Sequence, residues 1–175
     1  MLLAQTFEFS QKYDSIICVA GGFDAGTVAD VSIFEQYVVQ DKINFQSALL
    51  TAHLATKGLK DNGLLMFTGA AAVFEGPVNF AYAYYLAKST THALALQMSE
   101  RKEIPETATV VTLLPQMVDT PANRAAMPDA DKSEWAPCDK ISLMIRQWAD
   151  GENRPQNGSF AKVNYQNGVV YPTFL

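Results

Sequence analysis

Tyr84 and Lys88 are the residues of this 175-residue chain whose types and spacing best fit a chemical role. Of the seven tyrosines, only Tyr84 has a lysine four residues later. Positions i and i+4 share one face of a helix, so the phenol and the ammonium can point into one crevice. A cation beside a phenol lowers the pKa of the phenol from about 10 and favours proton exchange during a hydride transfer. A pair on the wet face of an ordinary helix is the alternative, and the position after a strand–glycine turn favours the chemical role.

The elements that would position this pair are short apolar runs separated by helical patterns. The runs rich in β-branched residues predict buried strands at residues 15–20, 64–68 and 107–114, with a weaker strand at 159–163. Helical spacing predicts helices at about 32–59, 81–99 and 139–149, the first beginning with a capping box at Ser32 and Glu35. We therefore expect a doubly wound α/β fold, a parallel sheet with helices on both faces.

Ligands of such sheets bind in the crevice outside the carboxyl ends of the strands. This rule selects three segments, residues 21–22, 69–71 and 115–120, for the candidate site. Residues 119–137 hold three prolines and show little periodicity, which predicts a lid or a binding loop.

The composition restricts the class of protein. An apolar content of 49% supports a buried core, and a net charge of −5 without basic clusters argues against nucleic acid and anionic membranes as partners. No run approaches the roughly 18 apolar residues of a membrane span, and the N-terminus does not resemble a signal peptide. Cys18 and Cys138 are far apart, which predicts two reduced thiols, no metal site and a cytoplasmic protein.

The motif Tyr84-Tyr85-Leu86-Ala87-Lys88 resembles the Tyr-x-x-x-Lys motif of the short-chain dehydrogenase/reductase family. Residues 18–22, Cys-Val-Ala-Gly-Gly, resemble the turn after the family's fourth strand, and Asn44 falls where the family places a helix asparagine. Within the family the chain best resembles the dihydropteridine reductase subfamily, above all in Asp-Thr-Pro-Ala-Asn-Arg-Ala-Ala-Met-Pro at residues 119–128. Residues 69–72 offer no hydroxyl where most of the family has a serine, as in that subfamily.

This resemblance implies a Rossmann-like fold and NADH-dependent reduction of a quinonoid dihydropteridine to the tetrahydropteridine, with NADPH as the alternative donor. It implies that Tyr84 supplies the proton, while Lys88 lowers the pKa of Tyr84 and binds the nicotinamide ribose. The implied cofactor-binding residues are Ala20, Gly21, Gly22, Lys88, Leu114, Pro115 and Thr120. It also implies a homodimer formed by the helix that ends near Leu59 and the helix that carries Tyr84.

Two departures from the family leave other functions open. The family's Gly-rich fingerprint belongs ahead of residue 15, so about 60 residues are expected to be absent and residues 1–175 to form one partial domain. A non-catalytic reductase remnant that serves as an interaction subunit is therefore one alternative. A carbonyl reductase for another substrate is a second, because Phe23 replaces the usual tryptophan and the loop at 75–83 differs.

The remaining polar and aromatic candidates are expected to have structural roles. His53 and His92 have no companions at ligand spacing, which favours packing or surface roles. Trp135 and Trp148 are predicted to be packing anchors. Arg124 could reach a substrate or phosphate oxygen or lie in solvent.

Overall fold

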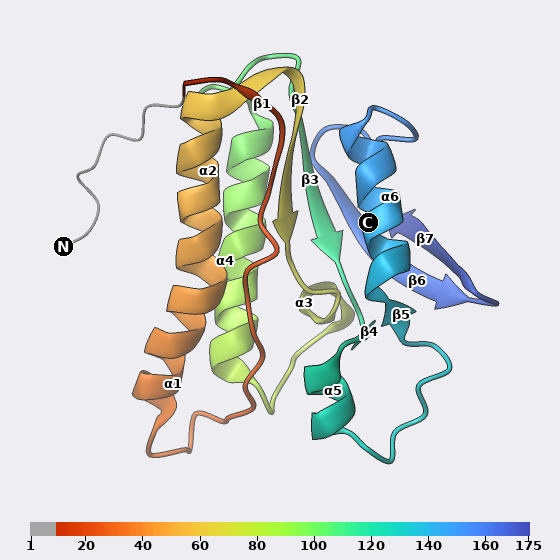
Figure 1. Ribbon diagram of the computed structural model, residues 1–175. Coiled ribbons are helices and arrows are strands. Elements are labelled where there is room, and N and C mark those ends of the chain that lie inside the picture. The colour runs from red at the N-terminus through yellow and green to blue at the C-terminus, as the bar shows by residue number, and fades with distance from the viewer. Residues whose placement is uncertain (1–9) are drawn as a thin grey trace.

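The computed structural model describes residues 10–175, in which helices cover both faces of a central sheet (Figure 1). The elements in chain order are β1 (Tyr13–Ile17), α1 (Ile33–Gln40), the π-helical segment η1 (Asp41–Gln46), α2 (Ser47–Gly58), β2 (Leu59–Thr68), α3 (Ala72–Glu75), α4 (Tyr82–Ser99), β3 (Thr109–Leu114), β4 (Val118–Asp119), α5 (Pro121–Ala126), β5 (Ala136–Pro137), α6 (Cys138–Ala149), β6 (Ser159–Gln166) and β7 (Val169–Phe174).

The main sheet has the strand order β1-β2-β3-β6-β7, in which the first four strands are parallel. The expected α/β fold is confirmed, with one correction. β7 was not predicted, and it pairs antiparallel with β6 at the edge of the sheet. Asn167 and Gly168 join the two strands with φ angles of 51° and 80°. An Asn-Gly pair is a strong hairpin signal, so the sequence did contain a sign of β7.

The core lies on both faces of the sheet because successive residues of a strand point in opposite directions. In β2, Leu65 and Phe67 face α2 and α4, whereas Leu64 and Met66 face α6. The α2 side chains at this contact are alanines, which let the helix lie close to the sheet: Ala48, Ala52 and Ala55. On the other face α6 contributes Ile141, Met144 and Trp148. Trp148 is 2% exposed and Trp135 6%, so their predicted packing role is confirmed.

The helix predicted at 32–59 is present, but it differs from the expectation at two places. Ser32 precedes α1 without forming the expected capping box, and its hydroxyl instead accepts a hydrogen bond from Gln36 Nε2 at 3.1 Å. In its middle, η1 widens the helix to π geometry over six residues. Such π segments are frequent at functional sites, and no sequence pattern announced this one.

Residues 119–137 are more ordered than their sequence indicated. α5 lies within this segment, and β4 and β5 form a separate two-stranded sheet that joins its two ends. These elements were not predicted, and the role of the segment as a lid or a binding loop stays a prediction. Thr120 caps α5 and Pro121 begins it, which is a helix start signal that the sequence contained.

Two observations bear on the chain's expected surroundings. Within residues 10–175, no helix is long and apolar enough to cross a membrane. Cys18 is buried and Cys138 is exposed, and both are free thiols as predicted.

The ends of the parallel strands meet at one edge of the sheet, where hydrogen bonds continue beyond the strands themselves. Cys18 N–H donates to Met66 O at 2.8 Å, and Gly69 N–H donates to Leu113 O at 2.8 Å. The three segments selected from the sequence for the candidate site therefore follow neighbouring strands at one edge.

Candidate functional site

Tyr84 and Lys88 lie one turn apart near the start of α4. Lys88 is 4% exposed, and its ammonium lies 5.9 Å from the centre of the Tyr84 ring. Lys88 Nζ also donates a hydrogen bond of 2.8 Å to the carbonyl oxygen of Thr68, the last residue of β2. This bond joins the helix that carries Tyr84 to the end of β2, at the carboxyl edge of the parallel strands.

Burial dominates the electrostatics of the pair. It lowers the pKa of Lys88 to about 8, and the nearby Cys18 thiol partly opposes this shift. Burial also raises the pKa of Tyr84, because a phenolate loses its solvation there. Burial alone accounts for the shift of the Tyr84 pKa, because the Lys88 ammonium is bound to the Thr68 carbonyl; the expected lowering of this pKa by Lys88 stays a prediction. A neutral phenol at this position can donate a proton.

Gly21 and Gly22 bring the backbone after β1 close to the same pair. A Cβ atom at Gly21 would lie 2.7 Å from Asn44 Oδ1 and 3.3 Å from Lys88 Nζ, and Gly21 has a φ of 156°. Only glycine fits there, because a side chain would collide with the Asn44 amide. Ala20, just before, is exposed.

Asn44 fastens this glycine turn to the π-helical segment. Its Nδ2 donates to Gly22 O at 3.0 Å, and its Oδ1 accepts from Gly22 N–H at 3.3 Å. Nδ2 also donates to Gln40 Oε1 at 2.9 Å, and both side chains are buried. Asn44 therefore lies against the candidate site, as the sequence suggested.

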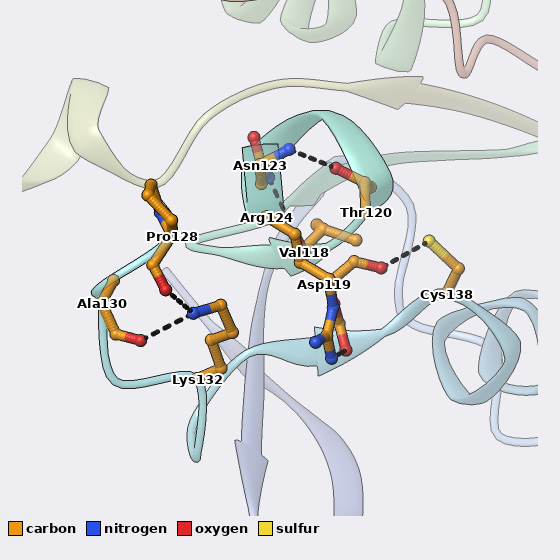
Figure 2. A network of polar contacts seen from close by, with 9 residues as sticks. All are labelled: Val118, Asp119, Thr120, Asn123, Arg124, Pro128, Ala130, Lys132 and Cys138. Carbon is orange, nitrogen blue, oxygen red and sulfur yellow. Dashed lines mark hydrogen bonds and ion pairs between the residues drawn. The ribbon is translucent and has the colours of Figure 1, made fainter. Parts of the chain in front are cut away.

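The segment after β3 holds the remaining residues expected at the site. Leu114 is fully buried and packs with Ala71 and Phe160, and Pro115, the next residue, is half-buried. Thr120 caps α5, and its Oγ1 accepts from Asn123 N–H at 3.1 Å, as Figure 2 shows. The Thr120 hydroxyl still has a proton to donate to a ligand.

Arg124 is paired within this segment. It binds the Asp119 carboxylate through two nitrogens, with Nη2 to Oδ2 at 2.7 Å (Figure 2). The pairing lowers the pKa of Asp119 and raises that of Arg124. A cavity of about 300 Å³ beside them is lined by Thr120 and Cys138 but by neither Tyr84 nor Lys88.

Two phenylalanines lie near Tyr84, of which one contacts its ring directly. Phe23 packs edge-on against Tyr84 with ring centres 5.1 Å apart, and Phe80 lies 6.5 Å from Phe23. Both phenylalanines are more than half exposed, at 59% and 58%. Gly26 N–H donates to Phe80 O at 2.7 Å, which fixes the two loops to each other. Sequence analysis singled out Phe23 but not Phe80, because the two meet only in the folded chain.

The two histidines are not ligands in this arrangement. His53 is exposed, and His92 is buried on α4 with its ring against Phe74 and Phe160. Among residues 10–175, no three His, Cys, Asp or Glu side chains lie close enough to hold a metal ion.

No family model matches the chain. A dihydropteridine reductase of Dictyostelium discoideum is 31% identical over 168 residues, which are 95% of this chain and 72% of that protein. A Serratia marcescens short-chain dehydrogenase/reductase variant superimposes with a TM-score of 0.73 at 19% identity, over 86% of this chain and 64% of that one. A Burkholderia cenocepacia dehydrogenase with bound NADP superimposes with a TM-score of 0.71 at 21% identity, over 93% of this chain and 63% of that one. The two solved structures show the fold.

A mostly parallel sheet whose carboxyl edge carries a half-buried tyrosine and a buried lysine one helical turn apart is typical of an oxidoreductase of the Rossmann type. The 31% sequence identity to the Dictyostelium reductase shows the family, and the chain belongs to the short-chain dehydrogenases/reductases. It spans less than three quarters of that relative's length and less than two thirds of the two solved chains.

Proposed function

We propose that this protein reduces quinonoid dihydropteridine to tetrahydropteridine, with NADH as the hydride donor and NADPH as the alternative. The placement of Tyr84 beside Lys88 and the glycine turn carries the proposal. The likeness to a dihydropteridine reductase supports the choice of substrate.

The residues at the crevice edge fit the nicotinamide end of the cofactor. Gly21 has no side chain to obstruct an approach, and Lys88 and Thr120 offer hydrogen-bond donors to a ribose and a carboxamide. Ala20, Gly22, Leu114 and Pro115 would line the same edge with backbone and apolar surface. When bound, the cofactor supplies the hydride.

The reduction also needs one proton, which Tyr84 would donate from its hydroxyl. Burial keeps this phenol neutral at physiological pH, because it raises the pKa of Tyr84. Lys88, with its pKa near 8, carries a proton over most of the physiological range and can restore the proton to the phenol through a ribose hydroxyl or water.

The surroundings of Tyr84 suit a flat ring. Phe23 and Phe80 present exposed aromatic faces, which a planar heterocycle could cover. Residues 69–72 contain no hydroxyl, and a quinonoid pterin, an imine-like acceptor, needs less polarisation than a ketone.

The decisive experiment follows the loss of NADH absorbance with chemically generated quinonoid dihydropterin, for the wild-type chain and for Tyr84→Phe. We expect turnover that falls by about 10²–10⁴ in the variant, the usual contribution of a positioned acid. No turnover by the folded wild-type chain would refute the proposal. Faster reduction of quinones or aldehydes than of pterin would favour the carbonyl reductase alternative, which rests on Phe23.

A non-catalytic interaction subunit is the second candidate, and exposed apolar side chains on α1 favour it. Val31, just before the helix, and Phe34 and Val38 within it are 101%, 80% and 64% exposed. Binding of NADH to the folded chain, measured by calorimetry, separates the two candidates, because a subunit without catalysis has no need of the cofactor.

We further propose that residues 1–175 act as one partial domain of a cytoplasmic homodimer. The outer faces of α2 and α4 support this interface, because Leu49 and Leu50 on one helix and Leu86 and Leu96 on the other are 41–50% exposed. Pairing these two helices with a second copy would cover all four side chains.

A further inference from the structure

The end of β2 is held by two side chains of α4, and only one of them belongs to the site described above. Lys88 donates to the Thr68 carbonyl at 2.8 Å. One turn further along the helix, His92 Nε2 accepts a hydrogen bond from Ala70 N–H at 3.1 Å. The two side chains therefore bind an acceptor and a donor only two residues apart on the same backbone segment.

The Ala70 amide has no strand to bind. Gly69 N–H donates to Leu113 O in the direction of β3, and Ala71 N–H is directed at Pro115 O at 3.5 Å. Ala70 is 3% exposed, so its amide is largely shielded from water. His92 provides the acceptor that a neighbouring strand would otherwise supply.

Packing alone does not account for a histidine at position 92. An imidazole that accepts at Nε2 carries its proton on Nδ1. That Nδ1 is buried and, among the described residues, has no hydrogen-bond partner. A leucine would fill the space against Phe74 and Phe160 without an unpaired Nδ1, but it would leave the Ala70 N–H without an acceptor, so the Nε2 lone pair is what histidine adds.

The surroundings keep the imidazole neutral and in place. Burial, assisted by the Lys88 ammonium, lowers the pKa of His92 to about 4, so Nε2 remains an acceptor at physiological pH. The His92 ring stacks on Phe74 and packs at a tilt against Phe160, with ring centres 5.2 Å apart in both contacts. Gly69 leaves room for it, because a Cβ atom there would lie 2.2 Å from Nε2.

We propose that His92 is a positioning residue, which holds the 69–71 backbone at a fixed place relative to Tyr84 through the Ala70 amide. The inference rests on the proposed function, in which this segment stands where most of the family has a serine. His92 would touch neither substrate nor cofactor, and its effect would reach the reaction through the backbone.

Two variants separate the hydrogen bond from the packing. His92→Leu keeps an apolar side chain of similar volume and removes the acceptor, whereas His92→Gln keeps an acceptor oxygen. We expect kcat for pterin reduction to fall about tenfold or more in His92→Leu, with KM for NADH unchanged, and to stay within about threefold of wild type in His92→Gln. An equal loss in both variants, or an unchanged kcat in His92→Leu, would overturn the inference.

A readout without turnover keeps this test separate from the proposed function. Hydrogen exchange at the Ala70 amide, followed by NMR, should be slow in wild type and His92→Gln and about tenfold faster or more in His92→Leu. The Tyr84 and Lys88 signals should shift with it only in the leucine variant. If wild type does not reduce pterin, the proposed function fails, and unaltered Ala70 exchange in His92→Leu would overturn the inference separately.

Discussion

Replacement of Gly69 by alanine probes the tightest contact at the end of β2. The new Cβ would lie 2.2 Å from His92 Nε2, 2.7 Å from His92 Cδ2 and 2.8 Å from Leu114 Cδ2. All three are far below ordinary van der Waals distances. Neither neighbour can move freely, because the His92 ring packs against both Phe74 and Phe160 and Leu114 is fully buried.

The magnitude follows from these contacts. Overpacking a rigid core costs about 1–3 kcal/mol, and the upper end applies to three simultaneous clashes. Displacing the imidazole also weakens the hydrogen bond to Ala70, which adds about 1 kcal/mol. We therefore expect Gly69→Ala to lower the free energy of unfolding by about 4 kcal/mol, which moves the midpoint of urea unfolding by about 2 M.

Gly151→Ala is the matched control. Gly151 has a φ of 85°, and a Cβ atom there would have no neighbour within 4 Å, so alanine meets only backbone strain. We expect it to cost about 1–2 kcal/mol, clearly less than Gly69→Ala.

Removal of the imidazole should relieve the clash. In the double variant Gly69→Ala/His92→Ala, two of the three short contacts disappear. In the double-mutant cycle, the double variant should therefore lose about 2 kcal/mol less stability than the sum of the losses in Gly69→Ala and His92→Ala. Equal costs for Gly69→Ala and Gly151→Ala, or a cycle without coupling, would refute this account of the packing.

Three further predictions concern pH and assembly. Because the pKa of His92 is lowered from 6.5 to about 4, the unfolded chain takes up its proton first, so stability should fall as the pH drops from about 6.5 to 4. Urea titrations should show this loss, by roughly 3 kcal/mol at most, and His92→Gln should remove it. If the Lys88 ammonium is needed for turnover, kcat should decline as the pH rises through about 8, and a profile flat to pH 10 would contradict that role. Leu86→Asp should convert the proposed dimer to monomers in sedimentation, whereas Leu143→Asp on α6, 65% exposed and away from the proposed interface, should leave it intact.

Local patterns in the sequence determined the main elements. The apolar runs of β2 and β3 and the periodicity of α4 and α6 are short-range features, because strands covered on both faces are mostly apolar. β1, which was also expected to be buried, lies at the edge of the sheet and is exposed or half-buried along its length. The i, i+4 spacing placed Tyr84 and Lys88 on one face of α4, and the rule for carboxyl strand ends placed that face at the crevice. The same rule for strand ends selected Gly21 and Gly22 for the candidate site.

Contacts between distant segments decided the rest, because no local pattern records them. The pKa of Tyr84 depends on how much of the phenol the fold buries, which the spacing to its lysine neighbour does not reveal. Phe80 meets Phe23 only because two loops are joined through Gly26. In the sequence, His92 is a histidine within a predicted helix, and no neighbouring residue indicates a special role. Only the tertiary structure places its Nε2 against the Ala70 amide, 22 residues away along the chain, where a buried N–H requires an acceptor.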